Sequence, residues 1–355
     1  MKALLRILIF AAVLLIGFFY FDSSITENEM LEAPRPMDPL PARDLIEMNL
    51  QPERPEEGIS VYIGQSTQEW LTDYGMPARI EPSAFGYEWW IYNQSYANYL
   101  MVGVKEGEVV QVYTAGTAID AAPYRVGQKL EDLYRFTIVE NEVTVKYGTN
   151  IYTFTLGPED LSTRLLVRFD GLFAQVYVGA IGEEIEAVRF MNAETLIMHR
   201  PYDMLYDGEL PPARSPSSTL QRSIDEANAN QLMDLSNVYR LHHQHNALEE
   251  NRASRLIAAS RAQEMAQKNL TSSAEQGLPP LNEALDQSGI TYGAAAENTA
   301  SQYLDAAEAV HGWFNSPDHR ETLLSSDYNM AGAGVFGKYY TLLFLEQKQS
   351  NAENQ

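Results

Sequence analysis

The chain has 355 residues, with 25 Lys and Arg against 48 Asp and Glu, and therefore a formal net charge of −23. Such an acidic chain lacks the cationic surface that supplies most nucleic-acid affinity, which argues against a DNA or RNA partner. The absence of cysteine excludes disulfides, Cys-ligated metal sites and a Cys nucleophile. A hydrophobic content of 45% is that of a folded protein, and the length suggests about two domains.

The N-terminal segment is strongly apolar. Every residue from Ile7 to Phe21 is apolar or small, and residues 3–21, at about 1.5 Å per residue, cover close to a hydrocarbon core of about 30 Å. Lys2 and Arg6 precede the run and acidic residues follow it, a bias that predicts the N-terminus inside and the rest of the chain outside the cytoplasm.

The way this run ends decides between two kinds of targeting segment. Phe18, Phe19, Tyr20 and Phe21 stand where a cleaved signal peptide needs small residues. We therefore predict an uncleaved transmembrane signal anchor over residues 1–21 and a single-pass protein of the cell membrane. A cleaved signal peptide, which would release a secreted protein, is the alternative.

Composition then divides the remaining chain. Residues 22–57 are polar, acidic and rich in proline, which predicts an extended spacer between the membrane and the folded part. A second proline-rich stretch predicts a linker over residues 201–222. Folded domains are expected at residues 58–200 and 223–346, and residues 347–355 are expected to form a disordered tail.

The first folded region contains an internal repeat, residues 63–116 and residues 126–180. Each copy begins with a hydrophobic-Gly-Gln triplet and continues with a short helical pattern and then alternating β-branched and aromatic residues. The pattern predicts a duplicated α+β domain. Gly64 and Gly127 are expected to form turns before the helices rather than a ligand site.

An aromatic cluster in the first copy allows two interpretations. Such a group can form a platform for carbohydrate or peptide, and it consists of Trp89 and Trp90 with the nearby Tyr87, Tyr92, Tyr96 and Tyr99. The same residues in a strand pattern also pack well in a core, and this is the interpretation that we favour.

The C-terminal region reads as helices followed by a closing hairpin. Helical patterns cover about residues 223–246 and 253–269, and the final MAGAGVFGKYYTLLFLE reads as two strands joined at Gly337-Lys338. Ser316 followed by Pro317 is typical of a helix N-cap and first helical position. This order predicts a layered α+β domain.

Three motifs then carry a family resemblance, namely AENTA at residues 296–300, WFNSPDHR at residues 313–320 and GAGV at residues 332–335. In this order they resemble the CAP domain of the SCP/PR-1 family, and the preceding repeat resembles the CAP-associated N-terminal domain of membrane-anchored proteins of Gram-positive bacteria. The resemblance implies an α+β protein in which a C-terminal α-β-α sandwich (the CAP fold) follows the duplicated α+β domain and one N-terminal transmembrane helix.

The resemblance also implies a cleft whose histidines and glutamates bind a divalent cation. Glu297 matches its motif glutamate and His319 its motif histidine, and this pair could bind zinc or act as a general acid and base. Ser273 stands where the family usually has a second histidine, and Leu342 stands where it usually has a polar residue. Because two ligands are fewer than the three of a catalytic zinc site, we expect weak or absent metal binding.

Further constellations offer alternatives. His242, His243 and His245 form a cluster in which His242 and His245 are spaced for metal capture on a helix, although a solvated helical face is the interpretation that we favour. Glu308 and His311, one helical turn apart, could supplement Glu297 and His319 as metal ligands.

Ser316 is a further candidate, as a serine nucleophile. Ser316 stands close to His319 in the sequence, but a helix N-cap already explains this serine, and a nucleophile needs a base and an orienting acid. No residue is therefore assigned a catalytic role, and Glu297 and His319 remain the candidates.

The sequence as a whole predicts a membrane-anchored, extracytoplasmic CAP-domain protein that binds a ligand or associates with the cell envelope without catalysis. The membrane, through residues 3–21, and a cell-wall polymer, lipid or peptide are the expected partners. One alternative is a divalent-metal-dependent, peptidase-like hydrolase that uses Glu297 and His319. Another is a wall-binding tether in which residues 58–200 recognise the wall.

Overall fold

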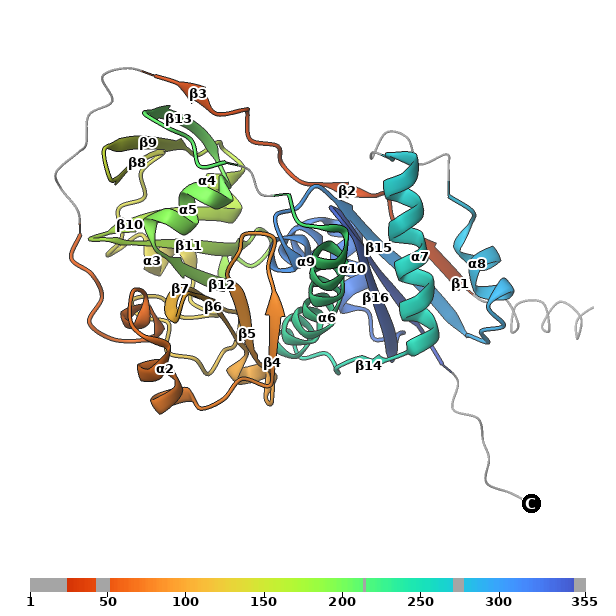
Figure 1. Ribbon diagram of the computed structural model, residues 1–355. Helices are drawn as coiled ribbons and strands as arrows, with labels where there is room; N and C mark the ends of the chain where they lie inside the picture. Colours follow the sequence, from red (N-terminus) through yellow and green to blue (C-terminus); the bar gives the residue numbers. More distant parts are fainter. Residues whose placement is uncertain (1–23, 43–51, 213–214, 271–277, 348–355) are drawn as a thin grey trace, which may run out of the picture.

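The computed structural model describes residues 24–42, 52–212, 215–270 and 278–347, which form two packed domains (Figure 1). Within these residues, no helix combines the length and the apolar character that crossing a bilayer requires. The predicted anchor, residues 1–21, and nearly all of the predicted tail lie outside the described residues.

A seven-stranded antiparallel sheet forms the centre of the first domain, in the order β10-β11-β12-β7-β6-β5-β4. Its strands are β4 (Arg79–Pro82), β5 (Glu88–Tyr92), β6 (Leu100–Lys105), β7 (Glu108–Thr114), β10 (Arg164–Phe169), β11 (Leu172–Gly179) and β12 (Glu184–Met191). The hairpins β6–β7 and β10–β11, one from each copy of the repeat, therefore lie in one sheet.

A smaller sheet, in the order β3-β13-β9-β8, and several short helices complete this domain. The strands are β3 (Leu40–Pro41), β8 (Glu142–Tyr147), β9 (Asn150–Thr155) and β13 (Asp203–Asp207). The helices are η1 (Ile59–Tyr62), α2 (Thr67–Tyr74), η2 (Tyr96–Asn98), α3 (Leu130–Leu133), α4 (Asp160–Thr163) and α5 (Ala193–His199). Because β13 pairs with β9, part of the predicted linker over residues 201–222 belongs to the domain.

The two repeat glycines form turns, as the sequence predicts. Gly64 and Gly127 have φ angles of 85° and 83°, in the left-handed region that glycine enters without strain. The Gly64 N–H donates to the Val109 carbonyl at 2.8 Å, and the Gly127 N–H donates to the Ile185 carbonyl at 2.7 Å. Each turn is thus bonded to a strand of the large sheet and precedes α2 or α3.

The C-terminal domain is built on a mixed sheet in the order β1-β15-β17-β16-β14, with β2 also paired to β15. The C-terminal part of the chain contributes four of its strands, β14 (Glu249–Glu250), β15 (Ala294–Ser301), β16 (Met330–Phe336) and β17 (Tyr339–Leu345). The helices are α6 (Ser218–His242), α7 (Arg252–Lys268), α8 (Leu281–Gln287), α9 (Ala306–Asn315) and α10 (Pro317–Leu324). β16 and β17 form the predicted hairpin, which turns at Gly337.

Helices cover both faces of this sheet, which confirms the α-β-α sandwich (Figure 1). Ala295 of β15 packs in one apolar cluster with residues of α7 and α8. The next residue, Ala296, packs in another cluster with residues of α6, α9 and α10. Because successive side chains of a strand point to opposite faces, each position on β15 is assigned to one helical layer or the other.

The domains share a continuous apolar core. Trp89 and Tyr99 of the first domain are buried in the same cluster as Leu232 and Tyr239 of α6 and Trp313 of α9. The aromatic cluster of the first repeat copy therefore packs in the core, largely at the domain junction, instead of forming an exposed platform. A shared core of this kind holds the two domains together through apolar burial.

The segment predicted as a spacer contributes strands to both domains. β1 (Ser24–Glu27) and β2 (Leu31–Glu32) run parallel to β15, and the chain then crosses to the first domain, where β3 pairs with β13 (Figure 1). We call residues 24–41 the N-terminal strap. The composition of the strap did not predict these strands, because only a few apolar residues pack, among them Met30, which is buried against α7. The strands are also held by backbone hydrogen bonds to the open edge of β15, which composition does not reveal.

Candidate functional site

Glu297, on β15, is held by an arginine on the α7 face of the sheet. Both residues are buried, and Arg261 Nε donates to Glu297 Oε2 at 2.6 Å while Arg261 Nη2 donates to Oε1. Burial lowers the pKa of Arg261, but the hydrogen bond and the charge of Glu297 outweigh it and raise this pKa above its usual value. Both carboxylate oxygens are thus committed to a bidentate ion pair.

His319 lies in the first turn of α10, on the opposite side of the same sheet. The side chain of Asn298, the residue after Glu297, donates to the His319 carbonyl at 2.9 Å. Because neighbouring residues of β15 point to opposite faces, the Glu297 side chain points away from α10. The two candidates from the motifs are therefore not brought together in one cleft.

Ser316 stands at the N-cap position of α10, but its hydroxyl makes no capping hydrogen bond. Ser316 Oγ lies instead 2.9 Å from His319 Nδ1. Burial lowers the pKa of His319, so the imidazole favours its neutral form. Within the described part of the chain, no carboxylate bonds to the other ring nitrogen, so this serine–histidine pair lacks the orienting acid of a hydrolytic triad.

The residues present do not fit the divalent-cation site that the family resemblance implies. Glu297 is neutralised by Arg261 and separated from His319 by the sheet. Leu342, at the usual polar position, is fully buried in the apolar core, and Ser273 lies outside the described residues. Glu297 lines a small pocket of about 100 Å³ together with Arg261 and, from the strap, Glu27, Asn28 and Met30.

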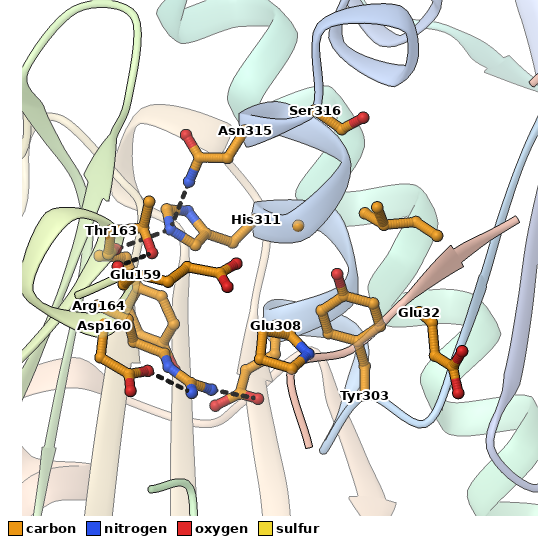
Figure 2. Close-up of a pocket in the computed structure, with 14 residues that line it drawn as sticks. Glu32, Glu159, Asp160, Thr163, Arg164, Tyr303, Glu308, His311, Asn315 and Ser316 are labelled. Carbon is orange, nitrogen blue, oxygen red and sulfur yellow. Dashed lines mark hydrogen bonds and ion pairs between the residues drawn. The ribbon is translucent and has the colours of Figure 1, made fainter. Parts of the chain in front are cut away.

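A larger set of polar groups lines a pocket of about 140 Å³ at the domain junction (Figure 2). Glu308 and His311 of α9 face α4 and Arg164 at the start of β10. Arg164 Nη1 donates to Glu308 Oε2 at 3.1 Å, and Arg164 Nη2 donates to Asp160 Oδ1 at 2.9 Å. Leu31, Glu32 and Pro34 of the strap also line the pocket, so three distant segments build it.

His311 is a neutral, buried member of this pocket. Burial lowers its pKa to about 4, because the charged imidazole would lose hydration. Its Nε2 lies 3.0 Å from the Thr163 carbonyl and its Nδ1 lies 3.3 Å from the Tyr239 hydroxyl. Glu308 and His311 were expected to supplement Glu297 and His319, but they line this separate pocket and contact the first domain.

The histidine cluster is also divided by the fold. Helix α6 ends at His242, so His242 and His245 do not share one helical face as the spacing predicts. His242 and His243 approach Glu186 of β12, whereas His245 Nδ1 lies 3.3 Å from Ser326 Oγ. Glu186 stands 57 residues before His243, in the other domain, and sequence spacing alone did not suggest it.

Other charged residues of the junction were also missed. Arg189 of β12 donates to Asp305 Oδ2 at 2.7 Å, and both residues are buried between the domains. An arginine in a strand with many apolar residues, as at Arg164 and Arg189, was the available signal, because a buried arginine requires a partner.

Comparisons with known proteins agree with this architecture. Residues 63–202 match the model of the CAP-associated N-terminal family, and residues 233–341 match that of the cysteine-rich secretory protein (CAP) family. The uncharacterized membrane protein YlbC of Bacillus subtilis is 33% identical over 293 residues, which cover 82% of this chain and 85% of YlbC.

Two crystal structures match most of this chain over their whole length. An extracellular protein of Bacillus anthracis that contains an SCP domain has a TM-score of 0.76 and 33% identity, covering 85% of this chain and 100% of that one. A cysteine-rich secretory protein of Staphylococcus aureus has a TM-score of 0.73 and 26% identity, covering 88% and 100%. The chain therefore belongs to the CAP family of cysteine-rich secretory proteins, with a CAP-associated N-terminal domain.

Proposed function

We propose that this protein is a membrane-anchored, extracytoplasmic ligand-binding module of a Gram-positive cell envelope, and that it is not a hydrolase. The observation that carries this proposal is the bidentate Arg261–Glu297 pair, which faces away from His319. An acid–base pair or a metal-bound water at the CAP motifs would need Glu297 free and on the same side as His319. The hydrolase alternative therefore has no geometric support.

The location follows from the first residues and from the relatives. Residues 3–21 have the length and the flanking charges of a signal anchor. One relative is named a membrane protein, and one structural neighbour is described as extracellular. Because the strap begins directly after this run, the anchor would hold the CAP sheet close to the membrane rather than at the end of a long spacer.

The ligand site that we propose is the pocket at the domain junction (Figure 2). Glu308 and Asp160 already neutralise Arg164, and Glu32 is paired with Arg35, so Glu159 leaves the pocket with an excess of negative charge. Tyr177 and Tyr303 supply aromatic walls. This lining favours a ligand with an amine or several hydroxyl groups, such as the peptide or sugar portions of a cell wall, over an anionic polymer.

The shared core also bears on the tether alternative, in which residues 58–200 act alone. Tyr177 and Arg164 of the first domain line the same pocket as His311 and Glu308 of the CAP domain. A ligand in this pocket would contact both domains, so we expect recognition to need the intact pair.

Co-sedimentation of the full chain, kept in detergent, with isolated cell wall tests this proposal. We expect the wild type and Glu131→Gln to sediment with the wall and Glu159→Gln to sediment less. Both variants remove one exposed carboxylate from the first domain, but only Glu159 lines the pocket. A wild type that stays in the supernatant would overturn wall binding, and chelator-sensitive peptide hydrolysis by the purified chain would overturn the non-catalytic role.

A further inference from the structure

Three side chains with metal-ligating atoms also meet at the domain junction, outside the lining of the pocket in Figure 2. Glu186 comes from β12 of the first domain, whereas His242 and His243 stand at the end of α6. Glu186 Oε2 lies 3.0 Å from His243 Nε2 and 3.3 Å from His242 Nδ1. All three ligand atoms lie within 4.8 Å of one another.

These separations suit a tetrahedral ion. Ligand atoms at about 2.0–2.1 Å from zinc stand about 3.3 Å apart along each edge of the tetrahedron. Both nitrogen–oxygen distances are close to this value. Two imidazoles and one carboxylate also form a known zinc ligand set, which leaves a fourth position for water or a ligand.

The surroundings hold the carboxylate in place and leave the imidazoles accessible. The Glu186 side chain is 1% exposed, whereas those of His242 and His243 are 14% and 21% exposed. A Cβ at Gly179 would lie only 2.7 Å from Glu186 Oε1, so the glycine leaves room for the carboxylate in its present position. The Phe314 ring lies against His243 with ring centroids 4.8 Å apart, which fixes the imidazole orientation.

A positive charge close to Glu186 also bears on cation binding. Arg320, which lies over the Phe314 ring at 3.7 Å, interacts with Glu186 through space and is the competing cation near the cluster.

We propose that Glu186, His242 and His243 bind a zinc ion that joins the CAP-associated domain to the CAP domain. This site is distinct from the one that the CAP motifs imply, and its ligands come from both domains. The proposal does not depend on the ligand-binding role of the pocket in Figure 2. Zinc at this position would connect β12 to the end of α6 and stabilise the folded pair of domains.

Zinc titration of the full chain, treated with a chelator and kept in detergent, tests the site. We expect one zinc per chain by calorimetry and elemental analysis, and loss of stoichiometric binding in Glu186→Gln and His243→Asn. His245→Asn is the matched control, because it removes an imidazole two residues beyond His243 that bonds to Ser326 instead. Circular dichroism of each variant without metal establishes that it is folded.

Two further readouts decide between a metal site and a simple ion pair of protonated histidines with Glu186. Cobalt substitution should give the visible spectrum of a four-coordinate ion in the wild type and not in Glu186→Gln. Zinc should raise the Tm of the wild type and of His245→Asn, but not that of Glu186→Gln. The proposal is overturned if the wild type binds no stoichiometric zinc, or if folded Glu186→Gln binds it as tightly.

Discussion

Two buried glutamates of this molecule stand beside basic side chains, yet their surroundings allow different chemistry. Glu297, in the CAP sheet, gives both oxygens to Arg261 of the same domain. Glu186, in the first domain, contacts two imidazoles of the other domain, and both lie close to the same oxygen, Oε2. A guanidinium saturates a carboxylate and excludes a metal, whereas neutral imidazoles and a carboxylate can share one.

The comparison also shows where a motif match stops being informative. The motif AENTA preserves Glu297 and the strand that carries it, but a residue outside that motif decides what the glutamate does. Glu186 belongs to no motif that we identified, and the meeting of two domains decides its surroundings. Experiments on both glutamates and on the elements around them can therefore contradict this contrast or refine it.

The largest expected effect on stability comes from breaking the ion pair between Arg261 and Glu297. Arg261→Met would leave the Glu297 carboxylate buried without a partner, and we expect the free energy of unfolding to fall by about 3–5 kcal/mol. Both side chains are 4% exposed, so water cannot replace the lost partner. Urea denaturation measures the change.

The matched control for that prediction is the double variant Arg261→Met with Glu297→Leu. It removes both charges and should recover most of the lost stability, because no buried ion remains. A double variant as unstable as Arg261→Met would show that the arginine acts through packing and not by neutralising Glu297.

The second largest effect is expected when the pH is lowered and His311, at the domain junction, is protonated. We expect the free energy of unfolding to fall by about 3 kcal/mol. The pKa of His311 is lowered by burial from about 6.5 to about 4. The unfolded chain therefore binds more protons than the folded chain between these values, and stability is lost as the pH falls from about 6.5 to about 4. Urea denaturation at a series of pH values measures this slope.

His311→Gln should flatten that slope without abolishing it. His199 is also buried, and burial lowers its pKa as well. Its protonation therefore also lowers the free energy of unfolding as the pH falls, and this contribution remains in the variant. An unchanged slope in His311→Gln would contradict a neutral, buried His311.

The strap is expected to contribute less. Asn28 Nδ2 donates to Asn298 Oδ1 and to Thr322 Oγ1, both at 2.8 Å. Asn28→Ala would leave the buried Asn298 oxygen without this donor, and we expect a loss of about 1–3 kcal/mol in urea denaturation. Limited proteolysis of the strap should also become faster.

Asp38→Ala is the control for the strap, because Asp38 is exposed on the same segment. We expect the stability and the proteolysis rate of this variant to match the wild type. An Asn28→Ala variant that behaves like Asp38→Ala would mean that strap pairing through Asn28 contributes little.

The smallest effect is expected at an exposed pair on the helix that carries Arg261. Lys268 Nζ lies 2.5 Å from Glu264 Oε1, with the side chains 42% and 33% exposed. Lys268→Ala should cost only about 0.3–0.5 kcal/mol in urea denaturation, because water solvates the Glu264 carboxylate after its partner is removed. If Lys268→Ala lost as much free energy of unfolding as Arg261→Met, burial would not be what makes the Arg261–Glu297 pair important for stability.

Local patterns in the sequence determined much of the architecture. Alternating β-branched residues and glycine turns predicted the repeated hairpins, and Gly337 predicted the β16–β17 turn, because these features depend on a few consecutive residues. The motifs around Glu297 and His319 predicted the CAP fold. An apolar run likewise predicted the anchor, which remains a prediction.

Only the tertiary structure decided what the chemistry-bearing residues do. Strand parity places Glu297 and His319 on opposite faces of one sheet, although their motifs predict a common cleft. Domain packing brings Glu186 to His243 across 57 residues, and to the adjacent His242. Burial of charge depends on contacts between distant segments, and the strength of every ion pair depends on that burial, so spacing along the chain could not supply these partners.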